Sequence, residues 1–154
     1  MKRLLAAVLA LSSLQAAEPE RWTDPKAGLS CAVPEGWAFQ EFTDGTAIFR
    51  EKDKKPPAFL NVRKSARKGT LEAYAKENLK ELTVPAKDLK ACVSGKRKAL
   101  RASGSVEASG GKLFDLLLFL DDAKGYLLVM LTCLPEDAEK YAPVLDAFAQ
   151  ELRT

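Results

Sequence analysis

The chain contains no histidine among its 154 residues. Without an imidazole it cannot form a Ser-His-Asp or Cys-His catalytic arrangement, and it lacks the commonest neutral metal ligand. Its three cysteines include no C-x-x-C pair, which disfavours a thiolate metal site or a thioredoxin-like redox pair. Glycine-rich phosphate-binding motifs and the G-x-S-x-G nucleophile motif are also missing. A carboxylate pair or a Ser-Lys couple remains conceivable, but we predict no catalytic residue, no metal site and no cofactor.

The N-terminal apolar run is too short to span a bilayer. Lys2 and Arg3 precede apolar residues 4–11, and small residues follow as far as Ala17. A transmembrane helix needs about 20 apolar residues, whereas a basic, then apolar, then small-residue order is typical of a secretory signal peptide. A buried N-terminal helix is the alternative, but no capping residue or amphipathic pattern indicates one. We therefore predict a signal peptide over residues 1–17 and a periplasmic or secreted protein with no transmembrane segment after processing.

Basic and acidic residues are nearly balanced in number, 24 against 21, but unevenly placed. Basic residues gather in two clusters, whereas residues 135–154 are mainly acidic. Clusters of one sign can attract an oppositely charged partner, although a solvated surface has the same composition. Nucleic acid is a poor candidate, because an exported protein rarely meets it. If they share one surface, the following residues are candidates for contact with an envelope lipid or an acidic protein: Arg50, Lys52, Arg63, Lys64, Lys96 and Lys98.

Short strands are predicted in the first half of the chain. Residues 18–27 are polar and contain two prolines, so we expect an exposed leader. Apolar residues alternate from Leu29 to Val33, which predicts one buried face of a strand. The following Pro-Glu-Gly is expected to turn the chain and tuck Trp37 against the sheet. Asp44-Gly45 is a hairpin signal, and further strands are predicted over residues 46–52 and 59–64.

The second half predicts two helices around the most apolar strands. Thr70 is placed to cap the start of a helix. The helix carries one apolar stripe, which we expect to pack against the sheet; the alternative is that the stripe binds a partner. Residues 113–120 and 126–134 are apolar at nearly every position and are joined by a short turn, so they should be antiparallel central strands covered on both faces. Pro143 is expected in the first turn of a C-terminal helix. Without a repeat or linker, residues 28–154 should form a single domain.

The cysteines of an exported protein meet an oxidising environment, where a pair within reach forms a disulfide. The candidates are Cys31, Cys92 and Cys133, an odd number that permits at most one intramolecular bridge. Cys31 and Cys133 fall in apolar strands, which suits either a bridge or small buried side chains. The pairing stays open. We expect the cysteines to be structural, because no histidine is present to activate a thiolate.

Asp115 interrupts the most apolar strand of the chain. We expect this carboxylate at a strand edge or paired with a basic side chain. The enzymatic alternative is a carboxylate-based hydrolase, for which a buried Asp115 or Glu107 with a strongly raised pKa would be the signal.

Four segments resemble the PsbP-like domains: residues 28–37, 47–50, 70–75 and 125–141. The resemblance extends over about residues 26–152. This group includes the extrinsic PsbP subunit of the oxygen-evolving complex, a Ran-binding nuclear import factor and many small exported bacterial proteins. It implies an α+β fold in which an antiparallel sheet is sandwiched between helices, and a fold used mainly for binding proteins. It carries no catalytic motif, and fold by itself does not fix function.

We therefore expect a non-catalytic exported binding or accessory module. Its partner would be another protein or an anionic envelope component. Two alternatives stay open: a carrier of a small apolar or lipid-like ligand, held in an apolar pocket with few polar groups, and the carboxylate-based hydrolase.

Overall fold

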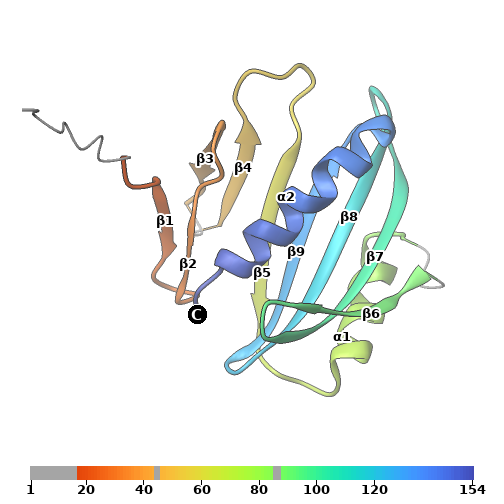
Figure 1. The fold of residues 1–154 in the computed structure, drawn as a ribbon. Helices are drawn as coiled ribbons and strands as arrows, with labels where there is room; N and C mark the ends of the chain where they lie inside the picture. Colours follow the sequence, from red (N-terminus) through yellow and green to blue (C-terminus); the bar gives the residue numbers. More distant parts are fainter. Residues whose placement is uncertain (1–16, 44–45, 85–87) are drawn as a thin grey trace, which may run out of the picture.

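The computed structural model describes residues 17–43, 46–84 and 88–154 (Figure 1). All of the predicted signal peptide except its last residue lies outside these ranges. Two α-helices are described, α1 (Leu71–Glu81) and α2 (Ala138–Glu151), and a short 3₁₀ turn, η2 (Pro135–Asp137), precedes α2. The strands are β1 (Arg21–Asp24), β2 (Leu29–Ala32), β3 (Trp37–Glu41), β4 (Ala47–Glu51), β5 (Phe59–Ser65), β6 (Lys90–Ser94), β7 (Arg97–Ala108), β8 (Gly111–Asp122) and β9 (Gly125–Cys133).

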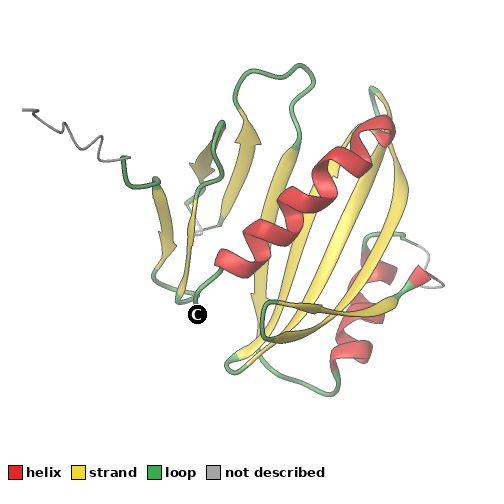
Figure 2. Ribbon diagram, viewed as in Figure 1, coloured by secondary structure: helices red, strands yellow, loops and turns green. Residues whose placement is uncertain are grey.

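Seven of these strands form one sheet in the order β3-β4-β5-β9-β8-β7-β6, and every neighbouring pair is antiparallel. Figure 2 shows α2 crossing the near face of this sheet and α1 lying behind it. A separate antiparallel ribbon of β1 and β2 lies beside α2. The predicted α+β fold, an antiparallel sheet between helices, is therefore confirmed.

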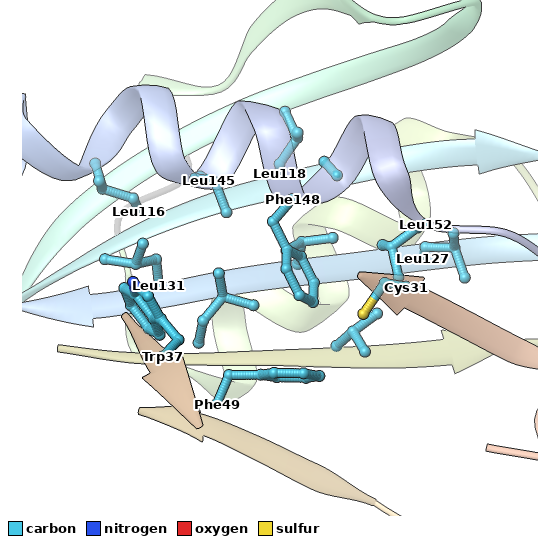
Figure 3. Close-up of a cluster of buried hydrophobic side chains, with 14 of the residues drawn as sticks. Cys31, Trp37, Phe49, Leu116, Leu118, Leu127, Leu131, Leu145, Phe148 and Leu152 are labelled. Carbon is cyan, nitrogen blue, oxygen red and sulfur yellow. The ribbon is translucent and has the colours of Figure 1, made fainter. Parts of the chain in front are cut away.

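The sheet has a hydrophobic core on each face, and β8 contributes to both. Leu116 and Leu118 belong to the core beneath α2, whereas Leu117 and Phe119 belong to the core beneath α1. Successive side chains of a strand point to opposite faces, so a strand covered on both sides is apolar at almost every position. The predicted central place of this segment and of the next apolar run, now β8 and β9, is confirmed. Figure 3 shows the α2-side core, into which Phe148 points from the helix.

The ribbon of β1 and β2 completes the α2-side core. Alternation in β1 turns Trp22 inward, where it is 2% exposed and packs edge-to-face against Phe49 at a ring-centroid distance of 5.5 Å. The prediction that residues 18–27 form an exposed leader is therefore wrong. One tryptophan in a short polar segment gives too weak an alternation to indicate a strand. What orders β1 is its pairing with β2, whose Cys31 lies opposite Trp22.

The two helices begin differently from each other. Thr70 caps α1 as predicted, because its Oγ1 accepts a hydrogen bond from the backbone N–H of Ala73 at 3.1 Å. The expectation that Pro143 stands in a first helical turn is wrong, since α2 begins at Ala138 and Pro143 lies inside it. Pro135 in η2 is the proline that stands at a helix start, where its missing N–H is tolerated.

Candidate functional site

The six basic residues predicted as an anion-binding surface do not share one surface. Arg63 and Lys64 are neighbours in β5 and therefore point to opposite faces of the sheet. Lys64 lies on the α2 side, where its Nζ donates a hydrogen bond to the carbonyl oxygen of Ala27 at 2.7 Å. Arg63 lies on the α1 side, because it is paired with Leu128 of the core beneath α1.

The other predicted basic residues are spread along the sheet. Arg50 lies in β4, on the same face as Arg63, and Lys52 follows in the loop after β4. Lys98 lies in β7, and three strands (β5, β9 and β8) stand between β7 and β4. Lys96 is in the turn between β6 and β7. Only Arg50 and Arg63 are therefore brought onto one face at one end of the sheet. Strand alternation and strand order, neither of which follows from residue composition, decide this.

Arg50 and Arg63 lie beside exposed apolar side chains, and together these residues form the β4–β5 surface. Ile48 is 36% exposed and Phe59 is 39% exposed. Arg50 is opposite Phe59 in the antiparallel register, and Ile48 is opposite Asn61. Residues directly opposite each other share a face of the sheet. The β4–β5 surface is thus defined by Ile48, Arg50, Phe59 and Arg63.

Most of the β4–β5 surface lies away from α1, although Arg63 interacts electrostatically with Tyr74 of that helix. The main contacts of α1 are with β7 and β8, on the other half of the sheet (Figure 1). At the β3 end of the surface, Phe42 is 44% exposed and lines a shallow hollow of about 150 Å³ with Ile48 and Phe59. Exposed large apolar side chains gathered in one place mark an interaction surface more often than single ones do.

The arginines of this surface are free for a partner. Neither Arg50 nor Arg63 forms an ion pair with another described residue, whereas Arg67, Arg97 and Arg101 each pair with an aspartate. The sequence identified the two arginines by charge. It did not identify Ile48 and Phe59, because an apolar residue in a strand is normally assigned to the core.

The three cysteines are free thiols, and no disulfide joins them in the structure. Cys31 in β2 and Cys133 in β9 are buried in the α2-side core, and Cys92 in β6 is half-buried. Burial raises the pKa of Cys31 to about 12 and that of Cys133 to about 11. A thiol with so high a pKa stays protonated near neutral pH, so these two residues act as small buried apolar side chains.

The two candidate carboxylates lie apart. Asp115 is 5% exposed in the central strand β8, and the hydroxyl of Thr132 donates a hydrogen bond to it at 2.6 Å. The expected strand-edge position or basic partner is thus not found. Glu107 is exposed, 3.8 Å from Lys112, and lies on the opposite face of the sheet from Asp115. Burial raises the pKa of Asp115, which is the direction expected of the hydrolase alternative, whereas Glu107 is exposed and the two residues do not form a catalytic pair.

No protein-family model matches the sequence, and no curated protein matches it. Among the described residues, no helix is long and apolar enough to cross a membrane.

Several solved structures resemble this fold. A protein of Bacteroides thetaiotaomicron matches with a TM-score of 0.64 at 15% identity over 88% of this chain, which spans only 48% of that protein. Cyanobacterial PsbP from Synechocystis matches with a TM-score of 0.53 at 14% identity, over 96% of this chain and 98% of that protein. LpqN, which is involved in cell envelope biogenesis of Mycobacterium tuberculosis, matches with a TM-score of 0.58 at 12% identity, over 90% and 86%. Similarity at these identities establishes architecture, and the chain has a PsbP-like fold.

Proposed function

We propose that this chain is an exported, non-catalytic binding module whose β4–β5 surface docks an acidic partner protein. The observation that carries this proposal is the combination of exposed Ile48 and Phe59 with unpaired Arg50 and Arg63 on one sheet face. Arginine binds carboxylates in a bidentate geometry, and apolar side chains beside it supply buried area. A segment with alternating acidic and apolar side chains would complement this surface.

An anionic membrane is a weaker candidate for the same surface. Recognition of anionic lipid headgroups typically uses a cluster of four to eight basic residues. The β4–β5 surface holds two arginines, and Lys64, which follows Arg63 in sequence, faces the other side of the sheet. An acidic protein therefore fits this surface better than an anionic membrane does.

Export and the lack of catalysis are parts of the same proposal. The signal-peptide pattern of residues 1–17 supports export. The similarity of fold to LpqN, a protein of cell envelope biogenesis, is consistent with work outside the cytoplasm. The absence of histidine throughout the chain and the high thiol pKa of Cys31 and Cys133 argue against a nucleophilic enzyme. Because Asp115 and Glu107 lie on opposite sheet faces, the hydrolase alternative has no carboxylate pair at these positions.

Photo-crosslinking in cells tests the docking surface. A photoreactive phenylalanine analogue at position 59 is expected to capture one protein. The matched control is the same analogue at Val93, which is 72% exposed in β6 at the opposite edge of the sheet. Mass spectrometry identifies the captured molecule. Capture of lipid instead of protein, or equal capture from both positions, would contradict the proposal.

Charge reversal then tests the two arginines. We expect Arg50→Glu with Arg63→Glu to weaken binding of the captured partner about tenfold, because two attractive contacts become repulsive. The control is Lys96→Glu with Lys98→Glu, which changes the net charge equally at the other edge of the sheet. Affinity measured at low and high salt should also show a weaker salt dependence for the arginine variant only. Equal losses in both variants would assign the effect to net charge.

A further inference from the structure

A second hollow lies on the opposite side of the sheet, between α2 and the segment that joins β2 to β3. Its volume is about 420 Å³, which is within the range of small-molecule sites. The floor is apolar and buried, with Trp37 at 5%, Phe148 at 2% and Val33 at 6% exposed. Figure 3 shows Trp37 and Phe148 on the sheet side of α2. Pro34 stands on the loop side, and the helix side is lined by Pro143, Val144 and Ala147. We call this hollow the α2 groove.

The α2 groove has acidic and no basic residues in its lining. Glu35 and Glu151 line it and are both exposed, which places their carboxylates toward solvent, above the apolar floor. Glu35 forms no ion pair with another described residue, whereas Glu151 pairs with Arg153 at 4.0 Å and lines a neighbouring hollow with Lys96 and Arg97. The lining therefore combines an aromatic floor with negative charge at the solvent side. That combination favours a positively charged group carried on an apolar body, because the apolar floor suits the body and the carboxylates at the solvent side attract an ammonium group.

The size of the α2 groove limits what can enter it. An α-helix is about 10–12 Å across with its side chains, and a hollow of about 420 Å³ cannot enclose one. The two proline walls are conformationally stiff, since each proline fixes one backbone angle. We infer that the α2 groove binds a small apolar molecule that carries an ammonium group. This site is separate from the β4–β5 surface, because it lies on the other face of the sheet.

Calorimetric titration of the purified protein with three matched probes tests this inference. The probes share a ten-carbon chain and carry a trimethylammonium, a maltoside or a sulfate headgroup, each used below its micelle-forming concentration. We expect the ammonium probe to bind more tightly than the maltoside and the sulfate to bind least. Equal affinities for the ammonium and sulfate probes, or no binding of the ammonium probe, would overturn the inference.

Two variants test whether the ammonium probe binds in the α2 groove. Ala147→Trp fills the hollow from the exposed side of α2 and is expected to reduce ammonium binding at least tenfold, whereas Ala73→Trp on the exposed side of α1 should not change it. Glu35→Gln with Glu151→Gln changes exposed side chains without filling the hollow. It should reduce the preference for ammonium over maltoside by roughly two- to fivefold per carboxylate, the range of exposed ion pairs. Unchanged ammonium binding in Ala147→Trp, or an unchanged preference in the glutamine variant, would refute the assignment. The variant Arg50→Glu with Arg63→Glu should bind the ammonium probe as the parent does, whether or not the β4–β5 surface binds an acidic protein.

Discussion

At the scale of single residues, Asp115 shows how a strand position sets the chemistry of a side chain. It lies on the α1 side of β8, opposite Thr132 of β9. Burial raises the pKa of this carboxyl, and the hydrogen bond from Thr132 lowers it by less, so the net direction is upward. The folded protein therefore holds a proton on Asp115 to higher pH than the unfolded chain does.

The raised pKa of Asp115 predicts a pH-dependent loss of stability. As pH rises past the ordinary aspartate pKa of about 3.9, the unfolded chain ionises first, so the free energy of unfolding falls until the folded protein ionises too. Asp115→Asn cannot ionise, and its amide oxygen can still accept the hydrogen bond from Thr132. We expect this variant to be more stable than the parent at neutral pH and equally stable near pH 3, as measured by urea unfolding. Asp53→Asn, at an exposed position, is the control. A variant destabilised equally at both pH values would show that ionisation of Asp115 does not control stability, and one destabilised only at neutral pH would show that the charged form is needed.

At the scale of elements, Arg97 fixes the C-terminal end of α2 to the sheet. Its Nε donates to Asp122 Oδ1 at 2.9 Å, and its Nη2 donates to the carbonyl oxygen of Leu152 at 2.9 Å. The last carbonyl groups of a helix lack partners within the helix, and a cation there also favours the helix dipole. Burial alone would raise the pKa of Asp122, but hydrogen bonds from Thr154, the Lys124 amide and Arg97 hold it below its usual range.

Replacement of Arg97 should therefore destabilise the domain strongly. Arg97→Met leaves Asp122, which is 6% exposed, without its cation, and loss of one partner of a buried pair costs about 3 kcal/mol. Arg101→Met removes a more exposed pair with Asp146 between the same strand and helix, and we expect less than about 1 kcal/mol there. Urea unfolding measures both.

The pKa of Asp122 is lowered, so its stabilising contribution is present above the pKa of the unfolded chain and is lost as pH falls through the pKa of the folded protein. The destabilisation caused by Arg97→Met should therefore become smaller in acid. Equal defects in the two variants would show that burial of the pair is unimportant.

At the scale of the whole molecule, β2 near the start of the chain pairs with the residues that follow α2. Ser30 of β2 exchanges two backbone hydrogen bonds with Arg153, at 3.0 and 2.8 Å. Trp22 of β1 and Leu152, which follows α2, belong to the same buried core. The ribbon of β1 and β2 is therefore part of the domain.

Two truncations separate the predicted signal peptide from β1. A chain that begins at Glu18 keeps β1 and should unfold at the same urea concentration as the full chain. A chain that begins at Lys26 loses Trp22, and removal of a buried tryptophan costs about 3–5 kcal/mol. Trp22→Ala in the longer chain should reproduce most of that loss. If the chain from Lys26 were as stable as the chain from Glu18, β1 would be dispensable. The mass of the intact protein recovered from outside the cytoplasm should show that residues 1–17 are absent.

Elements with a local signal were predictable from the sequence. The cap at Thr70 and the two apolar runs that became β8 and β9 are each indicated within a few neighbouring residues, because helix capping and strand periodicity act over that range. The general architecture followed too, since strands apolar on both sides require a layer on each face.

Which residues meet depends on the assembled fold. Arg63 and Lys64 are adjacent in sequence but lie on opposite faces, and Arg50 joins Arg63 only because β4 pairs with β5. Trp22 is buried through the pairing of β1 with β2. Likewise, the α2 groove joins the loop before β3 to a helix near the end of the chain. Strand order and register are set by the burial of apolar surface over the whole sheet, a property of the assembled chain that no short window of sequence contains.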